Sequence, residues 1–471
     1  MKYPVGVMVL AGLCLLAGGC AGTKSTEDKS NNYSYLDDKT LEKMDNDLSL
    51  LAQAIDRADE NSESSLRRGI SEQARRYQVA LISALSDYSS TPRRRLAGVV
   101  LGFTGDISVI GPLLDKINDQ DEPESVRINA VLGLATLGDK LRDYPKHDQL
   151  MNTLRAVMEN KDTSPSMRRT AITAYAASYD KVLNDSVSPL TDRFLGDNVL
   201  AVQVAAVNAL GDIGDVSATS DLVHGLTLPS EELRVASAIA LGKLADPNKV
   251  IVPALMAASE DDESSDVRRE ALCSLVSHFR GDPDVVFSAL LFGLSDLDDA
   301  VRESAAMALA ETTDERAIDP LVQATGDRSA LVRLAAAESL PLLVTKEKEA
   351  LAYPLVDLIS DQNPLVGRAA QSSLVKITGK NLGENQSQWR TYFYKAYPAL
   401  DPATAYVGKP KPRMTSNLQG SGGSRTSGTR TSGTRTTGTR TSGTGTRTSG
   451  TSGRTNNSGN RNSGNTGRTG R

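Results

Sequence analysis

Residues that commonly carry chemistry are sparse in this 471-residue chain and form no recognisable constellation. The three histidines, His147, His224 and His278, lie far apart, and none belongs to a His-x3-His spacing that would place two metal ligands on one helix face. The chain has no Gly-rich phosphate loop, no nucleophile elbow and no Cys-x-x-Cys pair. Acids are plentiful, as in residues 260–263, but the spacing of a calcium-binding loop is absent. We therefore expect helix caps and solvated charge, with calcium binding as the alternative, and no catalytic, cofactor or metal site.

What does recur is a short helical pattern that opens with Arg or Gln and returns every 31 to 41 residues. A small apolar run follows each opening residue, as in Arg234 to Leu244, with apolar side chains near the i, i+3, i+4 spacing of a helix face. Gly-Asp signals then end the run, and Pro often begins the next helix. We call the opening residues anchors; they are Arg94, Arg127, Arg168, Gln203, Arg234, Arg268, Arg302, Arg333 and Arg368. This period predicts stacked helix pairs, that is, a solenoid.

A second signal is an Asp placed six residues before the anchor. It is replaced by Leu228 before Arg234, and Asp197 precedes Gln203, which lacks the cation. The pairs are Asp121 and Arg127, Asp162 and Arg168, Asp262 and Arg268, Asp296 and Arg302, Asp327 and Arg333, and, at a distance of seven, Asp361 and Arg368.

Together these patterns resemble HEAT repeats, most closely the short type named after phycobilisome lyases, over roughly residues 92–380. The resemblance implies an all-α fold, an α-solenoid of about nine to ten HEAT-like helix pairs with disordered termini. It also implies that the Asp and Arg residues form a structural ladder of hydrogen bonds between successive turns; a row of Arg side chains that grasps an anionic ligand is the alternative. Deoxyhypusine hydroxylase, a HEAT-repeat enzyme, holds iron with His-Glu pairs, and this chain has none.

The solenoid is expected to occupy residues 39–398, with an atypical repeat at each end. Helices predicted over residues 41–58 and 71–86 form the first cap. Trp389, Tyr392 and Phe393 form the C-terminal cap, a carbohydrate or peptide platform being the alternative. The second helix of each pair should line the concave face, where Glu303, Glu338, Glu270 and Lys243 are candidates for contact with a partner. Cys273 lies in an apolar run and is expected to be buried.

The N-terminus carries an export signal. Residues 1–19 combine Lys2, an apolar stretch and small residues before Cys20, and they resemble a bacterial lipoprotein signal peptide. The resemblance implies that Cys20 is lipidated; an ordinary secretory signal is the alternative. Residues 20–38 are polar and predict a flexible tether. Ala21 after the lipidated Cys favours the outer membrane.

The C-terminal end has a different composition. A Pro-containing linker spans residues 399–419, and residues 420–471 contain only Gly, Ser, Thr, Asn and Arg, which predicts a disordered tail. The tail has nine Arg and no acid, so the −5 net charge of the whole chain leaves −14 for the residues before it. Three roles are open for the tail: a soluble spacer, attachment to an anionic envelope polymer such as cell-wall polymer or lipopolysaccharide, and folding back onto the acidic repeats of its own chain. Nucleic acid is disfavoured because the tail has no aromatic side chain for base stacking.

We therefore expect a non-enzymatic scaffold that is lipid-anchored in the bacterial envelope, faces the periplasm and presents its repeats to an unknown protein partner. The alternatives are an envelope-structural protein with an anchoring tail, and a lyase-like or hydroxylase-like enzyme.

Overall fold

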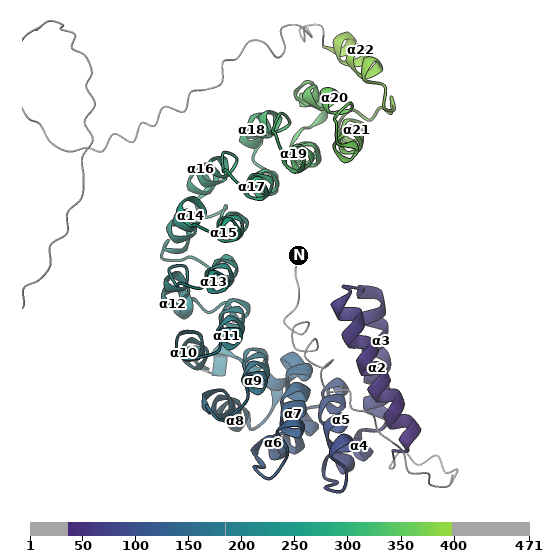
Figure 1. Ribbon diagram of the computed structural model, residues 1–471, viewed down its shortest axis with the longest axis vertical. Helices are drawn as coiled ribbons and strands as arrows, with labels where there is room; N and C mark the ends of the chain where they lie inside the picture. The colour runs from purple at the N-terminus through teal and green to yellow at the C-terminus, as the bar shows by residue number, and fades with distance from the viewer. Residues whose placement is uncertain (1–35, 184, 398–471) are drawn as a thin grey trace, which may run out of the picture. The chain divides into compact units, whose positions relative to one another are not determined.

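The computed structural model describes residues 36–183 and 185–397. Within these ranges all regular structure is helical, and the prediction of an all-α solenoid is confirmed (Figure 1). The predicted signal peptide with Cys20, most of the tether, and the linker and tail lie outside the described residues. No helix in the described part is both long enough and apolar enough to cross a membrane.

The helices of the repeats form two rows (Figure 1). The outer row contains α4 (Gln78–Leu85), α6 (Ile110–Asn118), α8 (His147–Glu159), α10 (Ser188–Gly196), α12 (Thr219–Gly225), α14 (Ile251–Asp261), α16 (Pro283–Gly293), α18 (Ile318–Ala324) and α20 (Pro354–Leu358). The inner row contains α5 (Thr91–Leu101), α7 (Glu124–Leu137), α9 (Pro165–Ser178), α11 (Leu200–Ile213), α13 (Glu231–Lys243), α15 (Ser265–Ser277), α17 (Asp299–Glu311), α19 (Ala330–Leu343) and α21 (Pro364–Thr378). Figure 1 shows the inner row, which holds the anchors, on the inside of the curve that successive repeats make.

Local sequence signals set the ends of the inner helices. The hydroxyl oxygens of Ser230 and Ser264 accept hydrogen bonds from backbone N–H groups in the first turns of α13 and α15. These bonds satisfy donors that have no partner within the helix. Gly214 and Gly379 end α11 and α21 in the left-handed conformation, each with φ of 69°.

Small residues allow neighbouring inner helices to pack closely. The tightest approach joins α5 and α7, where a Cβ added at Gly133 would lie 2.1 Å from the carbonyl oxygen of Gly98. Any larger side chain at this position would force the two backbones apart. The buried side chains form one continuous apolar core in which Ala is frequent.

Atypical helices close both ends. At the N-terminal end, α2 (Asp38–Asp56) packs against α3 (Glu60–Arg76), and Ile70 and Ala74 of α3 are buried. The helix predicted over residues 71–86 is wrong, because the chain breaks at Tyr77 between α3 and α4. At the other end, α22 (Gln386–Ala396) packs against α20.

Candidate functional site

A series of Arg–acid pairs, which we call the ladder, joins successive inner-row helices. In each pair the anchor Arg of one repeat reaches the carboxylate that precedes the inner helix of the next repeat. The pairs are Arg94–Glu122, Arg168–Asp197, Arg234–Asp262, Arg268–Asp296, Arg302–Asp327 and Arg333–Asp361.

The Arg302–Asp327 pair shows how each rung is built. Nε and Nη2 of Arg302 donate to the two carboxylate oxygens of Asp327, both at 2.9 Å, while Nη1 donates to the carbonyl oxygen of Asp296 at 2.9 Å. Asp327 Oδ1 also accepts the N–H of Ser329 at 2.7 Å. One guanidinium therefore binds the loop of its own repeat and the loop of the next, which fixes the stacking of adjacent repeats.

The electrostatics of the ladder follow from this geometry. Burial acts to raise the pKa of Asp327, but the hydrogen bonds from Arg302 and from the Ser329 N–H outweigh it, so this pKa lies below its usual value. The hydrogen bond with Asp327 raises the pKa of Arg302. Both groups stay charged at neutral pH. Because all three donor nitrogens of Arg302 are engaged, this cation is committed to the fold and is not available to an anionic ligand.

Two predicted ladder carboxylates take no part in an ion pair. Asp121 is exposed, and the neighbouring Glu122 turns inward to Arg94 instead, with Nε to Oε2 at 3.0 Å. Asp162 is also exposed, and among the described residues no carboxylate bonds Arg127. The Nε of Arg127 donates to the carbonyl oxygen of Ile117 at 3.2 Å.

The last anchor was predicted at Arg368, one residue after the position that the ladder spacing requires. Arg368 is exposed, and Gly367 occupies the position six residues after Asp361. A Cβ at Gly367 would lie 2.9 Å from the carbonyl oxygen of Ile359, so the site cannot take a long side chain without a shift of the backbone. The spacing of seven between Asp361 and Arg368 was the sequence signal for this difference.

The exposed side of the inner row forms a regular surface, which we call the inner grid. It consists of the positions one, five and nine residues after each anchor, with Gly367 taken as the anchor of α21 in place of Arg368; these positions fall on one stripe of a helix. From α11 to α21 its members are Val204, Asn208 and Asp212; Val235, Ile239 and Lys243; Arg269, Cys273 and Ser277; Glu303, Met307 and Glu311; Leu334, Glu338 and Leu342; and Arg368, Ser372 and Lys376, all exposed or half-buried.

Three of the four contact candidates named from the sequence, Glu303, Glu338 and Lys243, belong to the inner grid, whereas Glu270 is half-buried beside Arg269 at 3.2 Å. Sequence reasoning missed the apolar centre of the grid, where Met307 is 46% exposed. Cys273 was predicted to be buried, but it is exposed on α15. The reason is its register, five residues after the anchor, which turns the thiol away from the core.

Charges are distributed unevenly over the inner grid. Lys243 Nζ binds Asp212 Oδ1 at 2.7 Å, so these two grid charges neutralise each other. Glu303, Glu311 and Glu338 form no ion pair or hydrogen bond with another described residue. Desolvation first, and then the charge of Asp299, raise the pKa of Glu303. The grid surface of α17 and α19 therefore carries uncompensated negative charge beside exposed apolar side chains.

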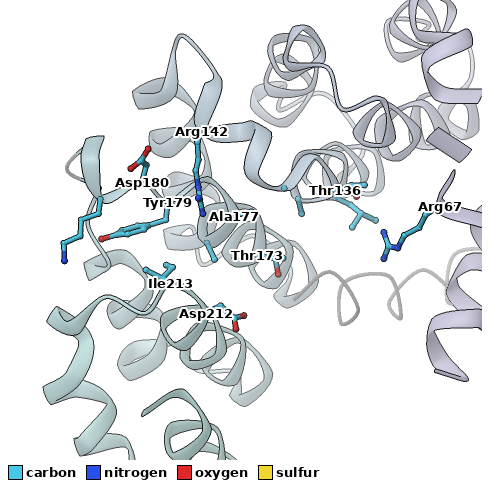
Figure 2. A pocket seen from close by; sticks show the side chains of 14 residues that line it. Arg67, Thr136, Arg142, Thr173, Ala177, Tyr179, Asp180, Asp212 and Ile213 are labelled. Carbon is cyan, nitrogen blue, oxygen red and sulfur yellow. Dashed lines mark hydrogen bonds between the residues drawn. The ribbon is translucent and has the colours of Figure 1, made fainter. Parts of the chain in front are cut away.

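A cavity of about 530 Å³ opens at the N-terminal part of the same surface. Figure 2 shows it between the C-terminal ends of α7, α9 and α11, with Arg67 of α3 on another side. Thr136, Thr173, Ala177 and Asp212 line it and occupy grid positions of these helices. The cavity is thus a recess in the inner face.

The three histidines lie apart from one another in different repeats. His147 Nε2 lies 2.8 Å from Asp185 in a buried pair, and His278 Nε2 lies 3.1 Å from the carbonyl oxygen of Leu241. His224 is exposed. In the described ranges, no group of three or more His, Cys, Asp or Glu side chains could hold a metal ion.

The aromatic side chains near the C-terminus are built into the end of the solenoid. Trp389 and Phe393 are fully buried, and Trp389 Nε1 donates to the carbonyl oxygen of Gly383 at 2.9 Å. The Tyr392 hydroxyl donates to Glu349 at 2.8 Å. With their faces buried, Trp389 and Phe393 offer no platform for stacking a sugar.

Comparison with known proteins gives the family of the repeats. A model described as HEAT repeats matches residues 187–276, 252–341 and 287–375. Deoxyhypusine hydroxylase of Eremothecium gossypii is 28% identical over 222 residues, which are 46% of this chain and 61% of that protein. The match therefore spans less than two thirds of this relative.

Several solved structures are similar at low sequence identity. Kap95p, from a study of its binding to RanGDP, is 15% identical with a TM-score of 0.49 and covers 77% of this chain and 53% of its own. YibA of Escherichia coli is 20% identical with a TM-score of 0.40, and the match covers 59% of this chain and 96% of YibA. Human deoxyhypusine hydroxylase is 20% identical with a TM-score of 0.24, and the match covers 58% of this chain and 97% of that protein. From the repeat matches and the two rows of helices we conclude that the described part of the chain folds as an all-α solenoid, whose residues 187–375 match HEAT repeats.

Proposed function

We propose that this protein is a non-enzymatic scaffold that binds a partner protein on its inner grid and is held at a bacterial envelope by a lipid on Cys20. The observation that carries the proposal is the inner grid itself. Its side chains stand at fixed intervals on helices whose stacking the ladder fixes, so a long surface is presented in one arrangement. Such a surface suits an extended protein contact better than a small substrate.

The chemistry of the grid also indicates which partner segment it fits. Met307 and Leu342 expose apolar surface on α17 and α19, and Glu303, Glu311 and Glu338 surround it with unpaired negative charge. A segment with apolar side chains and Lys or Arg would bury the first and neutralise the second. Methionine adapts its shape readily, which suits such a contact.

Photo-crosslinking in intact cells tests this surface. A photoreactive amino acid replaces Met307 on the inner row or, as a matched control, Phe292 on the outer row; the two side chains are 46% and 49% exposed. We expect a discrete protein adduct from position 307 and none from position 292. Equal adducts from both positions, or none from position 307, would count against binding on the inner grid.

Anchoring is tested separately. Cells fed labelled palmitate should label the wild-type protein and not a Cys20→Ser variant. Labelling that persists in the variant would show that lipid is attached elsewhere, and an unlabelled wild-type protein would reject the anchor.

The E. gossypii relative suggests an enzyme as another function, but the residues do not fit one that needs an iron site of His-Glu pairs. None of the three histidines is followed by Glu in the sequence, and two of them are held in bonds to Asp185 and to a backbone carbonyl.

A second candidate function comes from charge. Residues 420–471 contain nine Arg, and the residues before them have a net charge of −14, which favours a role in envelope structure through an anionic polymer. Deletion of residues 420–471 should then reduce co-sedimentation with cell wall in a salt-sensitive manner.

A further inference from the structure

The cavity at the ends of α7, α9 and α11 has the dimensions of a small-molecule site. Its volume of about 530 Å³ falls within the range of roughly 300–1,000 Å³ that ligand pockets occupy. Much of its lining is apolar and comes from three successive inner helices; these residues are Leu132, Ala135, Ala176, Ala177 and Ile213. The apolar lining could cover the body of a small organic molecule.

Three cations surround this apolar lining. Arg67 is paired with Glu63 at 2.7 Å, and Lys181 lies 3.4 Å from Asp215. Arg142 differs from both. It comes from the 3-10 helix η4 (Gly138–Asp143), extends toward Ala177 in Figure 2, and makes no hydrogen bond or ion pair with another described residue. A planar guanidinium with free donors next to apolar surface suits a carboxylate, sulfonate or phosphate.

The acids that line the cavity are already engaged. Asp212 accepts from Lys243 at 2.7 Å, and Asp180 Oδ1 accepts the N–H of Val182 at 2.8 Å. The C-terminal ends of the three helices add partial negative charge, which part of the cationic lining offsets. Among the described cations that line the cavity, Arg142 is the one that forms no ion pair or hydrogen bond with another described residue, in a part of the chain where net charge is strongly negative.

From this arrangement we propose that the cavity binds a small amphipathic organic anion. The apolar body of the ligand lies against Ala135, Ala177 and Ile213, and its anionic group accepts hydrogen bonds from Arg142. This site is independent of partner binding on α17 and α19, and either can exist without the other.

The test uses two fluorescent probes that share a body and differ in charge. The first, 8-anilinonaphthalene-1-sulfonate, carries a sulfonate; the second, N-phenyl-1-naphthylamine, lacks it. Each is titrated into the full chain, its Arg142→Gln variant and a control, Arg280→Gln, which removes an exposed Arg in the turn after α15. We expect Arg142→Gln to weaken the sulfonate probe by about tenfold or more, as the loss of a charge-assisted hydrogen bond predicts, with the neutral probe unchanged. Arg280→Gln should change neither.

A second variant tests the position of the site. Ala177→Trp adds a large side chain within the recess and should abolish binding of both probes, while far-ultraviolet circular dichroism reports whether the helices are retained. Equal sulfonate-probe affinity in the wild type and Arg142→Gln overturns the proposal. Undiminished binding to folded Ala177→Trp also overturns the proposal, because the probe would then bind nonspecifically elsewhere on the surface.

Discussion

Replacement of Asp327 by Asn tests whether the ladder holds the solenoid together. The substitution keeps one side-chain oxygen, which can still accept the Ser329 N–H, but it removes the charge opposite Arg302. The Arg302 side chain is only 5% exposed, so its cation would remain buried without a counterion. Removing one partner of a buried ion pair costs about 3–5 kcal/mol. Because the Asp327 side chain retains 16% exposure, we expect the lower end, about 3 kcal/mol.

The assay must be local, since stacked repeats need not unfold in one step. Hydrogen exchange followed by mass spectrometry measures the opening of α17 and α19 directly. A loss of about 3 kcal/mol corresponds to roughly 150-fold faster exchange in these helices if closing remains fast. The control is Asp121→Asn, which removes an Asp from the same position of an earlier repeat where the side chain is exposed, and which should change stability by less than about 0.5 kcal/mol.

The double variant Arg302→Met/Asp327→Asn separates charge from packing. If the buried cation is the source of the loss, its removal should restore much of the protection, because an apolar replacement of a buried pair is often near neutral. The reasoning fails if Asp327→Asn exchanges no faster than Asp121→Asn. It also fails if the double variant is as unstable as the sum of the single variants.

Three further outcomes follow from the same structure. The pKa values of Asp296, Asp327 and Asp361 are lowered in the folded protein, so these groups stabilise it above about pH 4, the pKa of Asp in the unfolded chain, and this stabilisation is lost as the pH falls through the pKa values of the folded state. Acid titration followed by circular dichroism should show the loss of helix. In Arg302→Met/Asp327→Asn the part of this loss that comes from α17 and α19 should be smaller. Gly133→Ala should destabilise the α5–α7 contact by about 1–3 kcal/mol in thermal unfolding, whereas Gly69→Ala, whose added Cβ meets nothing within 4 Å, should be neutral or stabilising. Arg368→Ala should leave hydrogen exchange in α21 near the wild-type rate, because this side chain is exposed. A loss of protection as large as that caused by Arg333→Ala would show that Arg368 is a member of the ladder.

The sequence predicted the repeats well because each one repeats the same local requirements. Small residues, Ser or Asp caps and an Arg at the start of the inner helix recur from repeat to repeat, and each of these features makes contacts with the adjacent repeat. The errors arose where chain length changes between repeats. The loop before α7 contains both Asp121 and Glu122, and spacing alone favoured the residue that turned out to be exposed. The prediction for Cys273 failed because an apolar run does not identify which side of a helix faces outward.

The cavity was beyond sequence reasoning for a different reason. Its lining comes from α3, from the ends of three inner helices and from two 3-10 segments, with up to about 150 residues between Arg67 and Ile213 along the chain. Nothing in the repeat pattern places Arg142 beside Ala177, because η4 follows α7 in an irregular connection between repeats. The inner grid, by contrast, could have been found by alignment of the repeats on their anchors and inspection of the positions one, five and nine residues later.

The positions that lack a ladder cation explain why the others keep one. Gln203 replaces Arg where the next repeat has Leu228 in place of an acid, and Gly367 replaces it at the last repeat, after which the chain continues into the α22 cap. A buried guanidinium at either position would have no carboxylate to pair with, and the cost of that isolation exceeds the benefit of one hydrogen bond. Cation and acid are thus absent together across a junction, as expected if their only role is to bind each other. Arg127 is the exception; it is half-buried and its Nε is satisfied by a backbone carbonyl, so it can keep its charge without an acidic partner. The junctions from α7 to α9 and from α11 to α13 therefore have no Arg–acid pair at the ladder position.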